Sequence, residues 1–257
     1  MNEFHGVSVM MGAVTETDSL RETVLRVLDV CDHRDLTEII IGYSQHVTTE
    51  SLAVVKELAA MECDVPIVTF MQKRRGISGL VDMIDVARGS HCLLVASDLA
   101  QDLSSIALMI ESAKKDGSVI ASSSRWMKGC SFYGYGKAKK LLNFAGQLFL
   151  RLLFGSRLTD FTNPVQIAPT ELYQAIAFEN EGFPILIEMV LKPLRLGYRF
   201  KEIPTNCYPR TQGKSNNSFR QTAAYFTTAL HIRFMKKKDI LKPDSALYRR
   251  MFGDKQI

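Results

Sequence analysis

The stretch RRGISGLVDMIDVARGSHCLLVASD, residues 74–98, contains the pattern that decides the fold. A glycine-containing loop leads into an amphipathic segment at 78–87, and a nearly uninterrupted apolar run follows at 91–96. A helix of this length before a continuously apolar strand is typical of a parallel sheet covered on both faces. The strand ends at Ser97-Asp98, and open α/β sheets bind ligands outside the carboxyl ends of their strands. The stretch therefore predicts an α/β fold with a carboxylate at its ligand-binding edge.

The same alternation of short apolar runs and longer amphipathic stretches extends through the first half of the chain. It predicts a mostly parallel central sheet flanked by helices. The remaining strands of this half are expected at 7–11, 38–42, 66–70 and 118–122, and the remaining helices at 18–30, 49–60 and 103–115.

The rhythm changes after about residue 123, where SSSRWMKGCSFYGYGKAKK is rich in aromatic, glycine and basic residues and predicts a loop. A helix is expected at 137–154, and its part LLNFAGQLFLRLLF, residues 141–154, is apolar nearly all round apart from Asn143, Gln147 and Arg151. It is either a packed helix or one that lies on a membrane surface. Further helices are expected at 170–177 and 185–196, and a strand at 198–203.

Length and composition bear on the domain organisation. With 257 residues, 46% of them hydrophobic and 23% charged, the chain can bury a full core. We expect one large domain at 1–216 and a C-terminal helical extension at 217–257, formed by an amphipathic helix and a basic tail. The five cysteines show no paired spacing, which argues against a disulfide framework and against a zinc site.

Signals for targeting and membrane insertion are not evident in the sequence. The first residues lack a basic segment followed by an apolar core, and no uncharged apolar run approaches the roughly 20 residues of a membrane span. We therefore expect a cytoplasmic protein, with any membrane contact peripheral and at the inner face. The formal net charge is +5, and basic residues crowd near the C-terminus. A lipid surface, a nucleic acid or simple solvation of the tail would each fit this charge.

The order of these segments resembles the family 2 glycosyltransferases of the GT-A fold, especially the enzymes that transfer sugars to polyprenyl phosphates. The likeness runs from about residue 7 to residue 216. The segments that carry it are VSVMMGAVTETDSL from Val7, EIIIGYS from Glu38, the stretch quoted above from Arg74, SSSRWMKG from Ser122, LTDFTNPVQIAPTELYQ from Leu158, and GFPILIEMVLKPLRLGYRFKEIPTNCYPRTQGKSNNS from Gly182. The resemblance implies a single GT-A-like domain that binds a nucleotide-sugar donor over the first strands.

The resemblance also implies which residues form the donor site. Donor binding is expected at Ala13, Glu16, Tyr43, Ser44, Arg75, Ser97 and Asp98. Asp98 is in addition the expected catalytic residue and the expected ligand of a divalent metal, Mg²⁺ or Mn²⁺. From its position alone, Asp98 also suits a carboxylate that caps the helix before Leu103.

Three departures from the family pattern fall in this donor site. Tyr43 and Ser44 replace the paired aspartates that hold the nucleoside, and Ala96-Ser97-Asp98 keeps one carboxylate of the Asp-x-Asp motif. Ala100 stands where the polyprenyl-phosphate branch has a metal-binding Gln. Mg²⁺ can rely on one or two carboxylates when waters and substrate phosphates complete its coordination shell. A reduced motif therefore weakens the expected metal site without excluding it.

The acceptor half implied by the resemblance is basic. Arg125, Lys139, Arg210 and Lys214 match positions that hold an acceptor phosphate. Such an acceptor is already an anion, so its attack on the sugar carbon needs placement and charge screening more than a base. A hydroxyl acceptor would need a base, and Asp160 is the catalytic residue expected in that case.

Other conspicuous side chains have two interpretations each. Glu188 is expected to be a buried carboxylate paired with a basic neighbour, in a structural or a functional role. Trp126, Tyr133 and Tyr135 suit the packing of their loop, although aromatic rings also line sugar sites.

Two functional hypotheses follow. The first is a glycosyltransferase of cell-envelope polysaccharide synthesis that moves a sugar from a nucleotide-diphosphate sugar to a lipid phosphate or a glycan. The second is a catalytically inactive relative that binds or regulates a partner, which the departures at Tyr43, Ser44, Ala96 and Ala100 favour. A nucleotidyltransferase is disfavoured, because no glycine-rich basic loop follows the first strand. A nucleic-acid partner is not expected, since no recognition motif accompanies the basic tail.

Overall fold

The first half of the chain alternates strands and helices, as the sequence predicts. We describe it from a computed structural model in which residues 3–209 and 219–253 are described. The elements are β1 (Val7–Ala13), α1 (Asp18–Val30), β2 (Leu36–Tyr43), α2 (Thr49–Ala59), β3 (Ile67–Met71), α3 (Gly79–Val86), β4 (His91–Leu94), α4 (Ser105–Lys115) and β5 (Ile120–Ser124).

The second half is mainly helical. Its elements are α5 (Lys137–Phe154), β6 (Gln166–Pro169), α6 (Thr170–Ala175), α7 (Ile185–Leu196), β7 (Phe200–Pro204), α8 (Phe219–Phe234) and α9 (Ala246–Phe252). The helices expected at 137–154, 170–177 and 185–196 and the strand expected at 198–203 are therefore present, with small shifts of their ends. Helix α9 lies in the segment for which the sequence predicts only a basic tail.

The strands of the described residues form one seven-stranded sheet of order β3-β2-β1-β4-β6-β5-β7. The pairs among β1 to β4 are parallel, as is the pair β5 and β7, whereas β6 lies antiparallel between β4 and β5. The mostly parallel sheet is as predicted, but β6 is not predicted from the sequence. Its four residues, QIAP, are too few to show the period of a strand.

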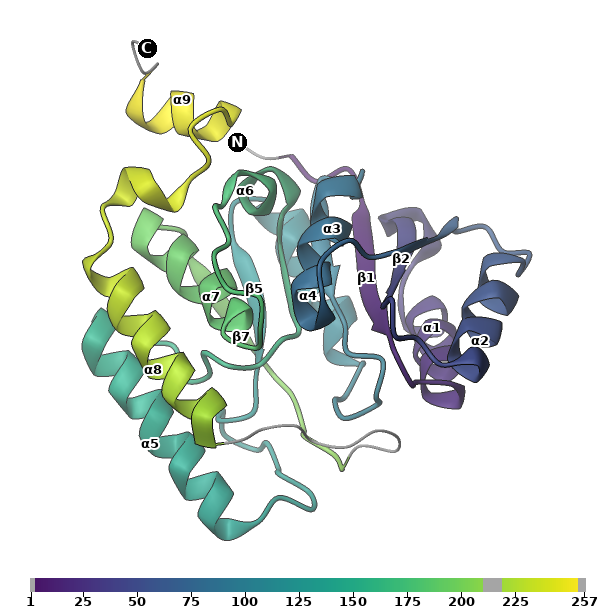
Figure 1. Cartoon of the computed structure of the whole chain (residues 1–257), viewed down its shortest axis with the longest axis horizontal. Coiled ribbons are helices and arrows are strands. Elements are labelled where there is room, and N and C mark those ends of the chain that lie inside the picture. Colours follow the sequence, from purple (N-terminus) through teal and green to yellow (C-terminus); the bar gives the residue numbers. More distant parts are fainter. Residues whose placement is uncertain (1–2, 210–218, 254–257) are drawn as a thin grey trace.

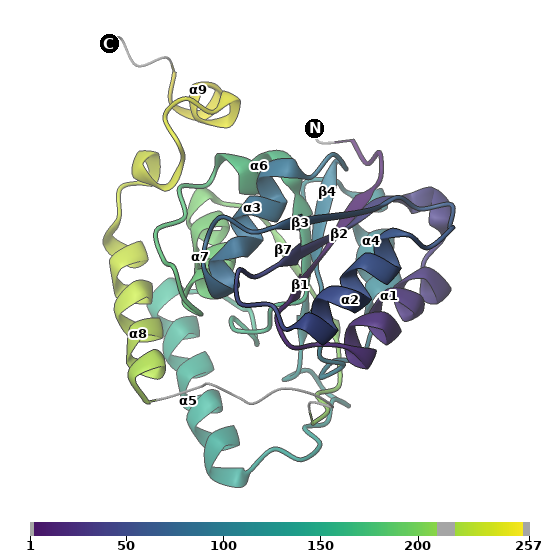
Figure 2. The same ribbon diagram turned by 45° about the vertical axis from the view of Figure 1, so that its right-hand side comes forward.

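Helices cover both faces of the sheet and bury two cores (Figures 1 and 2). Side chains alternate along β1, so that Val9 and Met11 enter the core beneath α1, α2 and α4, while Met10 enters the core beneath α3, α6 and α7.

Helices α5 and α8 lie side by side at one flank of the molecule, in both views of Figures 1 and 2. Ala229 and Ile232 of α8 share a third core with Leu150 of α5 and Ile187 of α7. Helix α9 packs against α6 through Tyr248. Within the described ranges, no helix is both long enough and apolar enough to cross a membrane.

Candidate active site

The carboxyl ends of β1, β2 and β3 meet at one border of the sheet, which we call the carboxyl edge. The parallel register aligns Ala13 of β1 with Tyr43 of β2. Ala13 is fully buried, and its carbonyl accepts a hydrogen bond from the Ser44 amide at 3.0 Å, so it forms the floor of this edge. Just beyond β1, the Glu16 carboxylate accepts hydrogen bonds from the two preceding amides at 2.8 and 2.9 Å. The predicted donor residues of β1 and β2 therefore lie together.

Asp98 belongs to the same edge, because the chain after β4 continues beside β1. The Ser97 hydroxyl donates a hydrogen bond to the Gly12 carbonyl at 2.6 Å. The chain then turns at Leu99, whose φ is 55°, and an Asp98 carboxylate oxygen accepts a hydrogen bond from the Ala100 amide at 3.1 Å. The turn that carries Asp98 is thus fixed directly against β1.

The segment that follows β7 joins the carboxyl edge to the loop before α5. Cys207 forms an antiparallel bridge with Gln101 and a parallel bridge with Phe132. Burial raises the pKa of the Cys207 thiol. The positive charge of Arg125 opposes this shift, whereas the negative charge of Asp98 adds to it. The predicted donor and acceptor residues therefore lie on either side of this one segment.

Arg125 and Asp160 form a buried ion pair at the end of β5. The Arg125 Nε and Nη2 atoms donate to the two carboxylate oxygens of Asp160 at 2.7 and 2.9 Å. Gln147 of α5 and Thr162 also donate to this carboxylate, and Glu202 of β7 accepts a hydrogen bond from the Asp160 amide. Burial alone would lower the pKa of the Arg125 guanidinium, but the charge and hydrogen bonds of Asp160 outweigh it and the pKa is raised. Both carboxylate oxygens of Asp160 are engaged by donors.

Arg125, Lys139 and Lys140 surround the rings of Phe132 and Tyr135, and we call these three residues the cationic cluster. Arg125 Cζ lies 5.9 Å and Lys140 Nζ 4.8 Å from the centre of the Phe132 ring. Lys139 Nζ lies 4.8 Å from the centre of the Tyr135 ring, and the two rings are 5.4 Å apart. Two of the predicted acceptor residues therefore lie together, and Lys140 joins them.

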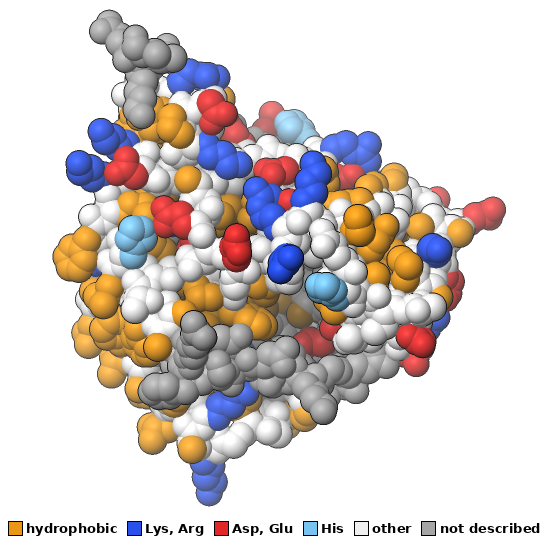
Figure 3. Space-filling model, viewed as in Figure 1, with side chains coloured by type: hydrophobic (Ala, Val, Ile, Leu, Met, Phe, Trp, Pro, Cys, Tyr) orange, Lys and Arg blue, Asp and Glu red, His pale blue; other side chains and the backbone are white. Residues whose placement is uncertain are grey.

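Helix α5 is packed on one face and exposed on the other. Gln147 and Leu150 are buried beneath it. The exposed apolar side chains of α5 and α8, which we call the apolar face, are Leu141, Leu142, Phe144, Leu148, Leu152, Leu230 and Phe234. Figure 3 shows apolar side chains gathered on this flank of the molecule. One face of α5 thus packs against the protein, and its opposite face is exposed.

A groove of about 290 Å³ opens at the start of α5, next to the cationic cluster. It is lined by Trp126, Leu141 and Phe144, with Lys137 and Lys140 on its rim. The Trp126 ring contacts the rings of both Phe132 and Phe144, with centres 4.7 and 5.3 Å away. Trp126 and Tyr135 therefore pack the loop, and Trp126 also forms the wall of this groove.

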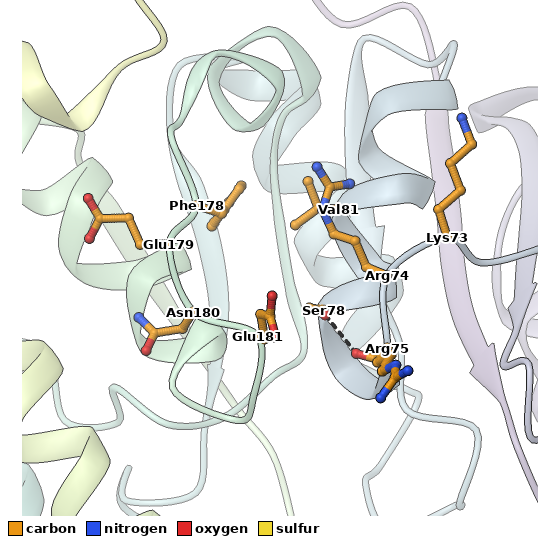
Figure 4. A pocket seen from close by; sticks show the side chains of 9 residues that line it. All are labelled: Lys73, Arg74, Arg75, Ser78, Val81, Phe178, Glu179, Asn180 and Glu181. Carbon is orange, nitrogen blue, oxygen red and sulfur yellow. Dashed lines mark hydrogen bonds between the residues drawn. The ribbon is translucent and has the colours of Figure 1, made fainter.

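A larger cavity, of about 460 Å³, lies between the loop before α3 and the loop before α7, and we call it the charged cavity. Lys73, Arg74 and Arg75 line one wall, and Glu179, Asn180 and Glu181 line the opposite wall (Figure 4). An Asp82 carboxylate oxygen accepts hydrogen bonds from the amides of Lys73 and Arg74, both at 2.8 Å, and fixes the basic wall from behind. The cavity brings Arg75, a predicted donor residue, to face an acidic wall.

Sequence reasoning missed several residues of these sites. Gln147, Thr162 and Glu202 bind the Arg125 and Asp160 pair, and the acidic wall of the charged cavity was not expected. A signal existed for Gln147, which is one of three polar residues in the mostly apolar stretch 141–154. The predicted acceptor residues Arg210 and Lys214 lie outside the described residues.

The predicted metal site can be tested against the side chains at the strand end. Within the part of the chain that the structure describes, no three His, Cys, Asp or Glu side chains gather as they would around a metal. Asp98 is the carboxylate at the turn after β4, and Ser97 directs its hydroxyl to a backbone carbonyl. This donor set fits a hard cation that takes its other ligands from water and phosphates, and it does not fit an ion held by protein alone.

Comparison with known proteins identifies relatives of the whole arrangement. The family model described as glycosyl transferase family 2 matches residues 8–180. An undecaprenyl-phosphate mannosyltransferase of Micrococcus luteus is 30% identical over 98 residues, which are 37% of this chain and 40% of the relative. The matched part is thus less than half of that relative.

Solved structures of glucosyl-3-phosphoglycerate synthase from Mycobacterium tuberculosis share the fold. The complex with Mn²⁺, UDP and glucosyl-3-phosphoglycerate has a TM-score of 0.65 at 15% identity, over 90% of this chain and 81% of that one. The complex with Mg²⁺ and UDP has a TM-score of 0.62 at 15% identity, over 89% and 79%. At this identity the likeness concerns the fold, and it confirms the predicted GT-A-like architecture.

Proposed function

Since this chain belongs to glycosyl transferase family 2, we propose that it transfers a sugar from a nucleotide-diphosphate sugar to a lipid phosphate, with a glycan as the other acceptor class. The observation that supports a lipid phosphate as the acceptor is the cationic cluster, which lies beside an apolar groove. Cations attract the phosphate, and the groove between Trp126 and Phe144 offers an apolar surface to the hydrocarbon. A neutral glycan would use neither feature.

The proposed reaction joins an acceptor phosphate oxygen to the anomeric carbon of the sugar. The bond from that carbon to the diphosphate breaks, and the nucleoside diphosphate leaves with the electron pair, so no proton is transferred. Arg125 and Lys139, together with Arg210 and Lys214, screen the acceptor charge and bring it toward the carboxyl edge. Asp160 acts in this scheme through Arg125, as the residue that orients the guanidinium. With a hydroxyl acceptor, Asp160 would be the base.

We assign the donor to the carboxyl edge. Glu16, Tyr43 and Ser44 would contact the nucleoside above the floor formed by Ala13, while Ser97 would lie near the diphosphate. Arg75 would contact the donor where the diphosphate joins the sugar. Asp98 would hold Mg²⁺ or Mn²⁺ together with the diphosphate, and that ion would neutralise charge on the leaving group. Solved neighbours of this fold contain Mn²⁺ or Mg²⁺ with UDP, which supports the assignment.

The apolar face suggests where the acceptor comes from. We propose that α5 and α8 rest on the cytoplasmic surface of a membrane, with Lys137, Lys140 and Arg151 at the lipid phosphates. The exposed fractions of Leu152 and Phe234 are 76% and 79%, values unusual for large apolar side chains that contact only water. The acceptor could then reach the cationic cluster without leaving the lipid surface.

A second function is favoured by the sequence at the carboxyl edge. Ala96 removes one carboxylate of the Asp-x-Asp motif, and Tyr43 and Ser44 replace the nucleoside-binding pair. In this second proposal the chain keeps the scaffold, binds a partner or regulates a true transferase, and performs no transfer.

One experiment separates the two functions. Purified protein is incubated with Mn²⁺, short-chain prenyl phosphates and a panel of UDP-, GDP- and dTDP-sugars, and glycolipid formation is measured by mass spectrometry. We expect transfer from one donor class, and no transfer when the prenyl phosphate is replaced by the corresponding prenyl alcohol. Absence of both transfer and donor binding across the panel would favour the second function.

A further inference from the structure

The charged cavity carries an inference beyond the donor edge. We infer that it receives the sugar part of the donor, with Glu181 as the acceptor of hydrogen bonds from the sugar hydroxyls. The inference rests on the proposed function, because a nucleotide sugar is the ligand in question. It assigns Glu181, which neither the sequence pattern nor the family resemblance indicated, and it gives the expected buried pair of Glu188 a supporting role.

Charges of both signs line this cavity without an ion-pair partner. Among the residues that the structure describes, Lys73 and Arg75 of the basic wall and Glu181 of the acidic wall form no ion pair. Their neighbours differ, since Arg74 pairs with Asp82, and Glu179 lies 3.8 Å from the Lys192 ammonium. On the acidic wall, Glu181 is therefore the charge that a ligand in the cavity would meet.

The acidic wall is held in place by a buried ion pair of α7. Glu188 and Lys192 lie one helical turn apart, both fully buried, with Nζ and a carboxylate oxygen 2.6 Å apart. Glu188 accepts hydrogen bonds from the amides of Glu179 and Asn180 at 3.1 and 2.8 Å and from the Asn180 side chain. The Lys192 ammonium donates to the carbonyl of Ala177. A loop tied at so many backbone atoms presents Glu181 from a fixed base, which is how a binding wall is pre-organised.

The chemistry of the two walls selects the ligand class. A sugar hydroxyl both donates to a carboxylate and accepts from a guanidinium, so a polyhydroxylated ring satisfies Glu181 and Arg75 together. A bare diphosphate would satisfy Arg75, but Glu181 would repel it. The volume of about 460 Å³ falls within the roughly 300–1,000 Å³ of small-molecule sites.

The test compares each nucleotide with its sugar nucleotide. Affinities for UDP, UDP-glucose, GDP and GDP-mannose are measured by isothermal titration in Mn²⁺ for the wild-type protein, for Glu181→Gln and for Glu62→Gln. Glu62 is an exposed carboxylate on the loop before β3, so its variant matches the change in net charge. Glu181 is itself exposed, and its substitution leaves the buried pair beneath it intact.

We expect Glu181→Gln to weaken binding of the preferred sugar nucleotide by about tenfold, because the sugar hydroxyls then donate to a neutral amide oxygen in place of a charged carboxylate. The same variant should bind the bare nucleotide as well as the wild type or slightly better, and Glu62→Gln should change neither. Equal changes for both ligands, or none, would overturn the cavity assignment while leaving the proposed function standing. A wild-type protein that binds no nucleotide at all would overturn both.

Discussion

The carboxyl edge and the end of β5 build their sites in opposite ways. At the edge, the contacts that hold Ser44 and Ser97 run to backbone carbonyls of β1. At the end of β5, side chains from α5 and β7 converge on one buried pair, Arg125 and Asp160. The first construction lets side chains change with little effect on the fold, whereas the second ties chemistry and stability together. This difference fits a sequence whose departures from the family gather at the edge.

The strongest test of the comparison is to remove the charge of Asp160. Asp160→Asn leaves the Arg125 guanidinium buried without its counter-charge, and we expect the free energy of unfolding to fall by about 3–5 kcal/mol. Urea denaturation measures it, with Asp98→Asn at the carboxyl edge as the matched control. The double variant Arg125→Leu, Asp160→Leu should recover much of the loss, because no buried charge is then left unpaired. A loss near that of Asp98→Asn would contradict the contrast between the two regions.

The second test concerns chemistry at the carboxyl edge. Asp98→Asn removes the carboxylate proposed to act with the donor diphosphate, so we expect the rate of transfer to fall by about a hundredfold, a cost typical of one electrostatic group. Stability should change by less than about 1 kcal/mol, since the turn amide of Ala100 can still bond to the amide oxygen. The transfer assay is run beside Asp102→Asn as a nearby control. Unchanged transfer would remove Asp98 from the mechanism.

A third test asks whether the region of the cationic cluster extends to a membrane. Leu152→Glu places a charge in the middle of the apolar face, and we expect binding to vesicles that contain phosphatidylglycerol to fall about tenfold. Leu25→Glu, at an exposed site of α1 on the other side of the molecule, serves as the control. Sedimentation with vesicles measures both. Equal binding by the two variants would argue against the apolar face as the contact.

The smallest expected effect lies at the start of β4, at the end of the strand opposite Asp98. Burial lowers the pKa of His91 below 6.5, although its hydrogen bond to the Gly117 carbonyl opposes the shift. As the pH falls, His91 is therefore protonated in the unfolded chain before it is protonated in the folded protein. The stability present above about pH 6.5 declines as the pH falls toward the pKa of His91 in the folded protein. We expect His91→Gln to reduce the loss between pH 7.5 and 5 by up to about 1 kcal/mol. Urea unfolding midpoints measured at pH 7.5 and at pH 5 would show this difference. An equal loss of stability between the two pH values in the wild type and in the variant would contradict it.

The sheet of the first half could be predicted from the sequence, because each strand is apolar over a run of its own and each is followed by a helix. Strand β4, and Asp98 in the turn that follows it, are examples in which local pattern and final position agree. Strand β6 could not be predicted in this way. Its four residues become a strand because β4 and β5 supply partners on both sides, which is information held by distant parts of the chain.

The candidate site shows the same division. The resemblance placed Arg125 and Lys139 among the acceptor residues, and the structure brings them to adjoining rings. Arg125 and its partner Asp160 are 35 residues apart in the sequence. Glu202, which accepts a hydrogen bond from the Asp160 amide, is a further 42 residues along the chain. No local spacing connects these residues, so their roles emerge only from the fold. The acidic wall beside Glu188 escaped prediction for the same reason.

Strand β6 also determines how the chain can be divided. It follows α5 in the sequence, but it is inserted between β4 and β5, two strands that precede α5. A chain cut in the loop near Gly134 would yield an N-terminal piece that lacks the strand between β4 and β5. The strands of the C-terminal piece would have no sheet to join. Each piece would depend on the other to fold. The fold thus lends itself to fragment complementation, in which two co-expressed halves recover the protein only when they meet.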